Sequence, residues 1–589
     1  MTGLVVLLPL ATALLLAVPR LRPTVASLMP LAALPALLAV FALPDAPDEP
    51  LRTISVLDVG LDPVGRVFLG FTSALWIASG WYARTALAED PKRSRFDAFF
   101  LLAMAGNFAL VLARDIPTFY AGFAVMGFAS AGLVLHEGSA AALRAGTVYV
   151  SLALLGEILL FGGFVFLANA AGTTEIAQFA DATPPLAALW MLLVGFGVKA
   201  GALCVHFWLP LAHPAAPLPA SAVLSGAMIK AGLLGWLRFL PLGETALPGI
   251  GFTMIALGLA GALLSAVVGV VQANAKTVLA YSSIAQMGIL TAGVGIGLVR
   301  PEAWPAVLPA LLIYATHHAL AKGALFLGIG PARQADGRAW RLVAAAGLLV
   351  PALALAGAPF TSGALAKFAL KANLSFLPAG WADALAVLLP IAAVGTTLKM
   401  CRFLWLVWPR PTPRESSVHA GLRAPWLFLV GAVLVAVWLL PGSAAVLAPA
   451  LAPAALWGAT WPLVIGGLLA AFAHRLQGRL RVAASLPAGD VVVPLERVLR
   501  LAQRLVRGGA AAAAALRVDV EPARRAVVRA AAAAARAEDG LRRWRVGGAS
   551  LVIVVTAFLL VLAFGGVSPG DQKRHGCCDD ARTGSARPG

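Results

Sequence analysis

The chain has 589 residues, of which 60% are hydrophobic and 12% are charged, and its formal net charge is +18. A soluble protein carries about a quarter charged residues, so this composition excludes an ordinary soluble enzyme or binding domain. Apolar runs of about 18 residues or more recur along the chain, and each is long enough to cross a bilayer as a helix. The predicted fold class is therefore an all-α polytopic membrane protein.

Sixteen membrane spans follow from these apolar runs. The first has no basic start and no small-residue cleavage pattern, so we interpret it as an uncleaved span and not as a signal peptide. The predicted spans are 3–18, 26–43, 64–83, 97–113, 116–135, 146–169, 184–204, 218–241, 250–271, 276–298, 306–329, 341–370, 381–408, 424–441, 455–474 and 549–566. Basic residues gather in alternate loops, which predicts an outside N-terminus and a cytoplasmic segment 475–548.

These spans divide the chain into parts. The parts are three N-terminal spans in 1–96, two groups of five spans in 97–241 and 242–408, two spans in 409–474, a basic segment in 475–548, a last span in 549–566 and a tail in 567–589. The basic segment holds fifteen arginines and six acidic residues. Arginines at three- and four-residue spacing predict a helix with one basic face on an anionic lipid surface, not on nucleic acid. The alternative is a disordered basic linker.

Two of the spans carry a lysine and are interrupted by proline. The seventh span carries Lys199 and is expected to break around Pro210, and the twelfth carries Pro351 and Pro359 before Lys367. Interrupted spans in corresponding halves of a chain indicate an inverted-repeat transporter that handles ions near the membrane midplane. A break frees backbone carbonyl and amide groups, which can hold water or ions inside the membrane.

Lysine is used sparingly, with nine lysines against thirty-six arginines. Among those in or near spans are Lys199, Lys230, Lys322, Lys367 and Lys399. An ammonium group can lose its proton when it is desolvated, whereas a guanidinium group effectively cannot. We therefore interpret these lysines as proton-carrying groups. The alternative, which applies most to Lys399 near its span end, is a side chain that extends to the membrane surface.

Histidines add a second set of titratable groups. His318 and Lys322 are four residues apart and share a helix face, and His206 follows Lys199 by seven residues, which is one face if the helix continues. Histidine titrates near neutral pH and can relay protons between lysines. The alternative for His206 is a structural hydrogen bond to the broken backbone, and His317 is expected to be structural. No carboxylate or cysteine cluster accompanies these histidines, so no metal site is predicted.

Four stretches in a fixed order resemble a known family. They are VKAGALCVHFWLPLAHPAAPLPASAVLSGAMIKAG (198–232), VQANAKTVLAYSSIAQMGIL (271–290), HHALAKGALFL (317–327) and APFTSGALAKFAL (358–370). Together they resemble the signature of proton-conducting antiporter-like subunits. This family includes subunits L, M and N of respiratory complex I, the large Mrp cation/proton antiporter subunits and membrane subunits of energy-converting hydrogenases. The resemblance covers roughly 97–408 strongly and the rest by layout.

The resemblance implies an antiporter-like core of about fourteen spans. Spans four to eight and nine to thirteen would form two inverted five-helix repeats with broken helices, followed by a fifteenth span, a basic lateral helix and a sixteenth span. Lys199 matches the family's central lysine of the first half-channel, and Lys230 matches the connecting residue on the eighth span. His318 and Lys322 match the linking residues of the eleventh span, and Lys367 matches the exit-side residue of the broken twelfth.

One position departs from the family pattern. The family places a glutamate on the fifth span, where it pairs with the seventh-span lysine, but the matching residue in FYAGFAVMGFAS is Ala124. Glu157, on the sixth span, is the nearest carboxylate within the membrane, and our hypothesis is that it takes over the pairing. The rival hypothesis is that the chain has lost part of the pumping cycle.

The expected function is a proton- or cation/proton-translocating subunit of a complex I-like or membrane-hydrogenase-like respiratory assembly. Its partners would be other membrane subunits, its transported ions protons or sodium, and its location a bacterial-type inner membrane. No catalytic, cofactor-binding or metal-binding residue is expected on this chain. The alternative is a subunit of a secondary cation/proton antiporter or a proton-coupled uptake complex without redox chemistry. The membrane lysines disfavour a purely structural subunit.

Overall fold

The protein is described by a computed structural model that covers residues 2–43, 58–179, 184–335, 337–409 and 420–476. Within these ranges the regular structure is helical, apart from two isolated β-bridges. Twelve helices in the described part of the chain are long and apolar enough to cross a membrane. Nearly all of the predicted basic segment, the last predicted span and the tail lie outside the described residues, so the number of spans stays a prediction.

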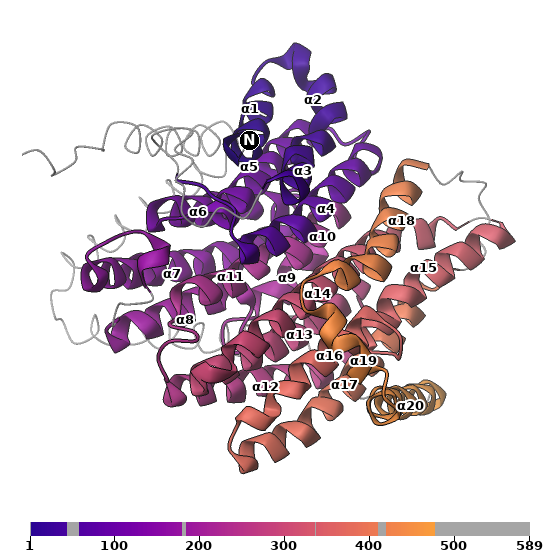
Figure 1. The fold of residues 1–589 in the computed structure, drawn as a ribbon. Coiled ribbons are helices and arrows are strands. Elements are labelled where there is room, and N and C mark those ends of the chain that lie inside the picture. The colour runs from indigo at the N-terminus through magenta and orange to yellow at the C-terminus, as the bar shows by residue number, and fades with distance from the viewer. Residues whose placement is uncertain (1, 44–57, 180–183, 336, 410–419, 477–589) are drawn as a thin grey trace, which may run out of the picture. The chain divides into compact units, whose positions relative to one another are not determined.

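Each predicted span before residue 475 falls on a helix or on consecutive helices (Figure 1). The α-helices of the first half are α1 (Thr2–Leu15), α2 (Arg22–Leu28), α3 (Leu34–Ala42), α4 (Pro63–Ala86), α5 (Arg93–Leu112), α6 (Ile116–Val134), α7 (Ala140–Ala171), α8 (Leu186–Ala200), α9 (Trp208–Ala215), α10 (Leu218–Val223) and α11 (Lys230–Phe239). Those described in the second half are α12 (Pro248–Val270), α13 (Ala275–Val299), α14 (Trp304–Arg333), α15 (Arg338–Ala356), α16 (Ser362–Lys371), α17 (Ala379–Val407), α18 (Ala420–Val435), α19 (Ser443–Ala450) and α20 (Pro453–Leu476). The short helices α9 and α19 lie between predicted spans.

The packing of the helices repeats between the two groups of five spans. α5 packs along α6 and α7 along α8 in the first group, while α12 packs along α13 and α14 along α15 in the second. In both groups the fourth span is the interrupted one, α8 with α9 and α15 with α16. Each group therefore pairs its first span with its second and its third with its fourth, which is the arrangement expected of a repeat.

The two interruptions have the same backbone geometry. α8 ends at a left-handed Gly201 (φ 71°), and α15 ends at a left-handed Gly357 (φ 88°). In each case the next amide closes a Schellman motif, from Ala202 to the Gly197 carbonyl at 2.9 Å and from Ala358 to the Leu353 carbonyl at 2.9 Å. The breaks thus begin as ordinary helix ends placed inside the membrane.

A second conformational signature follows three residues after each of these glycines. Cys204 (φ 76°) and Phe360 (φ 64°) are the two non-glycine residues with positive φ in the described part of the chain. The left-handed region is costly for such side chains. Its use at the same step after both breaks indicates that the two segments are structural counterparts.

The first break lies earlier than the sequence predicted. The prediction centred it on Pro210, but α8 already ends at Ala200, and Pro210 is the third residue of α9. Proline is tolerated in the first turn of a helix because the amide it lacks would be unpaired there. Pro210 therefore belongs to the restarted helix, and Gly201 marks the end of the first one.

Glycines let the first two helices of each repeat approach closely. Gly106 of α5 faces Gly122 of α6, and a Cβ built on Gly106 would lie 2.6 Å from the Gly122 carbonyl oxygen. In the second repeat a Cβ on Gly258 of α12 would collide with the Gly288 carbonyl oxygen of α13, and the reverse holds too. Such small-residue contacts are a common way to join helices in a membrane, where apolar burial gives little net gain.

We expect Gly258→Ala to destabilise the protein by about 1–3 kcal/mol, because the backbone of α13 must move to admit a methyl group. Gly249→Ala on the same helix is the matched control, because a Cβ at Gly249 meets nothing within 4 Å. Thermal unfolding of the two purified variants in one detergent checks the prediction. Equal melting temperatures would show that the two helices are not held at this contact.

Candidate functional site

The first part of the site surrounds Lys199, in the last turn of α8. Its side chain is buried, and its ammonium Nζ donates to the Tyr149 hydroxyl of α7 at 3.1 Å. That hydroxyl in turn donates to the Gly127 carbonyl of α6 at 3.1 Å. Lys199 is thus tied through one tyrosine to the fifth and sixth predicted spans.

Glu157 approaches the same place from α7. Glu157 and Lys199 line one small cavity together, with Phe123 and Trp208. A Cβ built on Gly127 would lie 3.4 Å from the Glu157 Oε1 atom and 3.4 Å from the Lys199 Nζ atom. The carboxylate and the ammonium therefore face each other across the space beside Gly127. The cavity measures about 10 Å³, close to the least that holds one water molecule.

The second part of the site surrounds Lys230, the first residue of α11. Just before it, Leu224–Met228 form a π-helical segment, a distortion that is frequent at functional sites. The fully buried Lys230 turns back on this segment, and its Nζ donates to the Ser225 carbonyl at 2.7 Å. The Ser225 and Ser283 hydroxyls are 2.8 Å apart, which joins this segment to α13.

His318 and Lys322 follow on α14, one turn apart and both fully buried. The Lys322 Nζ atom donates to the Leu279 carbonyl of α13 at 2.7 Å. Neither ring nitrogen of His318 has a hydrogen-bond partner within the described ranges. The π-helical segment packs against α14 here, since a Cβ on Gly226 would lie 3.0 Å from the Ala319 carbonyl oxygen. The structure thus brings the neighbourhoods of Lys230, His318 and Lys322 together.

The third part of the site is the second break. Lys367, on α16, reaches back across the break, and its Nζ donates to the Ala356 carbonyl at 2.6 Å and the Leu355 carbonyl at 3.1 Å. These carbonyls belong to the last turn of α15 and are left free by the interruption. A lysine therefore lies close to each break, before the first one and after the second one.

The comparisons with known proteins agree with this architecture. Residues 113–389 match the family described as NADH:quinone oxidoreductase/Mrp antiporter, TM. The segment contains both breaks and the lysines Lys199, Lys230, Lys322 and Lys367. This segment of the chain belongs to the family of antiporter-like membrane subunits.

Two curated relatives of this antiporter-like subunit carry different names. Hydrogenase-4 component B of Escherichia coli (strain K12) is 32% identical over 46% of this chain and 43% of its own length. A Na(+)/H(+) antiporter subunit of Alkalihalophilus pseudofirmus is 27% identical over 62% of this chain and 76% of its own length. The chain spans 43% to 65% of the length of the first curated relatives it matches.

Solved structures share the fold of the antiporter-like subunit. A chain of the Mrp complex from Dietzia sp. DQ12-45-1b matches with a TM-score of 0.67 and 24% identity, over 90% of this chain and 63% of that one. A chain of the membrane-bound sulfane sulfur reductase, an archaeal respiratory membrane complex, matches with a TM-score of 0.61 and 18% identity, over 80% and 99%. At these identities the likeness establishes the fold alone.

The structure corrects two expectations, one about the shared helix face of Lys199 and His206 and one about Lys399. Lys199 and His206 do not share a helix face, because α8 ends at Ala200 and the buried His206 lies in the segment that joins α8 to α9. Lys399 does not extend to the membrane surface. It is fully buried on α17, and its Nζ donates to the Ser265 hydroxyl of α12 at 3.3 Å.

His317 is bonded as a structural residue would be. Its Nδ1 atom lies 2.9 Å from the Ser362 hydroxyl, at the start of α16. This hydrogen bond ties α14 to the second half of the broken span, on the side away from Lys322. This contact is compatible with the structural role predicted for His317, which stays a prediction.

Sequence reasoning gave His213 no role, although it lies within the first family motif. His213 is fully buried on α9, its ring stacks on Phe326 of α14 at 4.6 Å, and neither ring nitrogen has a partner in the described part of the chain. Near it, the Lys276 Nζ atom donates to the Ala216 carbonyl at 2.7 Å. The sequence signal that could have identified His213 was its place in an apolar stretch close to several prolines.

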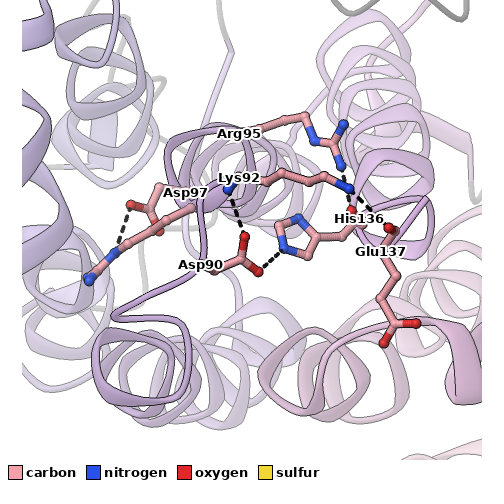
Figure 2. A network of polar contacts seen from close by, with 7 residues as sticks. Asp90, Lys92, Arg95, Asp97, His136 and Glu137 are labelled. Carbon is pink, nitrogen blue, oxygen red and sulfur yellow. Dashed lines mark hydrogen bonds and ion pairs between the residues drawn. The ribbon is translucent and has the colours of Figure 1, made fainter. Parts of the chain in front are cut away.

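A polar network closes one end of the first repeat, where the α4–α5 loop meets the α6–α7 turn (Figure 2). The His136 Nε2 atom lies 2.8 Å from an Asp90 carboxylate oxygen, and the Lys92 amide donates to the other at 2.7 Å. The Lys92 ammonium donates to the Glu137 carbonyl at 3.0 Å, and Arg95 donates to the His136 carbonyl. The network holds the end of α6, the helix that carries Gly127.

Partial burial raises the pKa of Asp90, but the His136 hydrogen bond, the Lys92 amide and the nearby positive charges together hold this pKa below its usual value. A carboxyl with a lowered pKa stabilises the folded state above its unfolded pKa, about 4, and this stability is lost as the pH falls further. We expect Asp90→Asn to lower stability by about 0.5 kcal/mol at pH 7.

Melting temperatures of the wild type and Asp90→Asn between pH 7 and pH 3 test this prediction. The difference between them should be full above about pH 4 and should narrow below it. Glu89→Gln, at an exposed neighbouring carboxylate, controls for the loss of charge. A difference that does not change with pH would assign the effect to packing.

Proposed function

We propose that this chain is a proton- or cation/proton-translocating membrane subunit of a larger assembly. The observation that carries the proposal is the bonding of five membrane lysines, which are Lys199, Lys230, Lys322, Lys367 and Lys399. Each ammonium is bonded to a neutral oxygen, and none of the five has an acidic ion-pair partner among the described residues.

Bonding to neutral oxygens suits a group that exchanges protons. A charged lysine inside a membrane costs about 2.5–3.5 kcal/mol on insertion scales. A lysine that forms an ion pair would leave a buried carboxylate uncompensated when it loses its proton. A lysine whose neighbours are carbonyl or hydroxyl oxygens alone leaves no such charge behind, so both of its protonation states can be occupied in turn. This describes Lys230, Lys322, Lys367 and Lys399, whereas Lys199 also has the Glu157 carboxylate across a small cavity.

In the proposed path, protons move along water and the groups Lys199, Lys230, His318, Lys322 and Lys367. Glu157 supplies the carboxylate beside Lys199 in place of the glutamate missing at Ala124. His206 is retained as a relay candidate next to the first break. A positive charge that arrives at one lysine favours loss of the proton from the next lysine. Through this coupling, proton transfer at one group would drive proton transfer at its neighbour.

The parent assembly is proposed to be a complex I-like or membrane-hydrogenase-like respiratory complex in a bacterial-type inner membrane. Other membrane subunits would be its partners, and the N-terminus would lie outside. The basic segment 475–548 would rest on anionic lipid at the cytoplasmic face. The name of hydrogenase-4 component B supports a redox parent. The name of the Na(+)/H(+) antiporter relative supports the alternative, a secondary antiporter with protons and sodium as its ions.

Ion flux in inverted membrane vesicles tests the proposal. The chain is expressed with the membrane subunits encoded beside it in a host that lacks its own sodium/proton antiporters, and the internal pH is followed with a dye. Flux driven by added sodium would place the chain in the antiporter class, and flux that requires an electron donor would place it in the redox class. Proton flux that Lys230→Met leaves unchanged, or no flux under either condition, would contradict the proposal.

A further inference from the structure

A cavity of about 500 Å³ lies beside the second break. Its walls come from the end of α15, from α16 and α17, and from α19 and the first half of α20. α19 packs on α16, and α20 packs on α17. Its volume falls within the range of small-molecule sites in proteins. The cavity lies outside the chain of lysine contacts described above, although Lys367 borders it.

The lining of this cavity is that of an amphiphile site. Its polar side chains are Tyr314, Lys367 and Lys371, and no acidic residue lines it. The Tyr314 hydroxyl already donates to the Gln286 carboxamide at 2.7 Å, and Lys367 donates to the α15 carbonyls. An apolar cavity with so few free polar groups does not hold water well, because a buried water needs two to four partners. A hydrocarbon chain therefore suits this cavity better than water does.

The remaining polar group sets the charge of the occupant. Lys371, the last residue of α16, is exposed and has no hydrogen bond or ion pair from its side chain within the described ranges. Its ammonium borders the cavity without a counter-charge, so it fits an anionic head group. Basic residues beside pockets between membrane helices bind acidic lipid head groups in the same way.

The size and position of the cavity favour a flexible chain. A helix about 10 Å wide with a pitch of 5.4 Å would place only about one turn in this volume, so a partner helix is a poor fit. α20 is the outermost of the contributing helices, with only 11% of its most apolar window buried. Its neighbouring side chains, such as Trp457 and Val464, are exposed, so the bilayer has access to this wall.

We propose that this cavity is a binding site for an anionic phospholipid. One acyl chain fills the apolar space between α16, α17 and α20, and the phosphate head group lies against Lys371. The bound chain closes the cavity to water on the side of Lys367. The inference concerns lipid binding and does not depend on the proposed transport function.

The test uses the full chain in detergent with a phosphatidylglycerol that carries a diazirine on one acyl chain. After photolysis, mass spectrometry of peptides locates the crosslinks. We expect crosslinks on lining residues such as Leu389, Ala455 and Ala459. Unlabelled phosphatidylglycerol should compete for the site. Unlabelled phosphatidylcholine should compete about fivefold less well, because its choline cation offsets the phosphate charge that Lys371 would attract.

Two pairs of variants separate the acyl chain from the head group. Gly458→Phe fills the cavity and should remove the crosslinks. Gly467→Phe, on the same helix but away from the lining, should keep them, and a Cβ at either glycine meets nothing within 4 Å. Lys371→Gln should weaken phosphatidylglycerol binding about fivefold, while Lys371→Arg should retain it.

Three results would overturn the proposal. Crosslinks on the cavity residues that persist in Gly458→Phe would place the lipid elsewhere. Equal competition by the two unlabelled lipids would remove the anionic preference. In native membranes, crosslinks that join the cavity residues to another protein in place of a lipid would assign the cavity to a partner subunit.

Discussion

Glu157→Gln is expected to lower proton flux about tenfold or more, and adding Ala124→Glu to the same chain is expected to restore most of it. Glu157 and Lys199 face each other beside Gly127, each 3.4 Å from the same point in space. A carboxylate within about 4–6 Å of an ammonium changes its proton affinity by tenfold or more. Glutamine keeps the shape of the side chain and removes only the charge.

Proton flux in vesicles that contain equal amounts of each variant measures the effect. Glu244→Gln, at an exposed carboxylate, is the control and should leave the flux unchanged. Unchanged flux in Glu157→Gln would rule out the compensation hypothesis, and the protein would then work without a carboxylate at Lys199. If Glu157→Gln abolishes the flux and Ala124→Glu fails to restore it, the carboxylate beside Lys199 would have to come from position 157 on α7.

Lys322→Arg is expected to abolish flux as completely as Lys322→Met does. Lys322 is fully buried, and its ammonium contacts the Leu279 carbonyl. Arginine keeps the positive charge but effectively cannot release a proton, whereas methionine removes the charge and keeps a similar length. If Lys322 served only as a fixed charge, arginine would preserve activity and methionine would not.

The same vesicle assay separates these two cases. Size-exclusion profiles must first show that both variants fold, since arginine is larger than the space lysine leaves. Lys92→Arg is the matched control, because Lys92 is exposed and donates to a backbone carbonyl. Flux in Lys322→Arg near the wild-type level would contradict proton exchange at this position.

The sequence was sufficient to predict the helical architecture, because an apolar run of 18 or more residues has few other structures open to it. The break predicted in the twelfth span lies close to the observed one, whereas the break predicted in the seventh span lies several residues too late. Proline guided the prediction, yet Pro210 lies in the first turn of α9, and a glycine, Gly201, marks the end of α8. Both breaks begin at the glycine of an Ala-Gly-Ala, at residues 200–202 and 356–358, but the same tripeptide at 260–262 lies inside the unbroken α12, so it is no signal by itself.

The site was only partly predictable for a related reason. Residue type and spacing identified Lys199, Lys322 and Lys367, since a lysine in a span is rare enough to be informative. What lies opposite each lysine depends on helix packing. The Tyr149 contact and the space at Gly127 come from three different helices, and no single stretch of sequence contains that pattern. Lys399 illustrates this limit, since its position near a span end left burial and surface exposure equally open.

The two breaks also have an electrostatic consequence. Lys199 lies in the last turn of α8, and the Lys367 ammonium is bonded to the last turn of α15. Although one lysine precedes its break and the other follows it, both are placed at the C-terminal, negative end of a half-helix dipole, Lys199 by its position in the last turn of α8 and Lys367 by the bonds of its ammonium. A dipole of backbone carbonyls cannot be titrated, so it attracts a proton equally at every pH. The proposed proton path would therefore pass two fixed partial charges, each beside a lysine whose own charge would change.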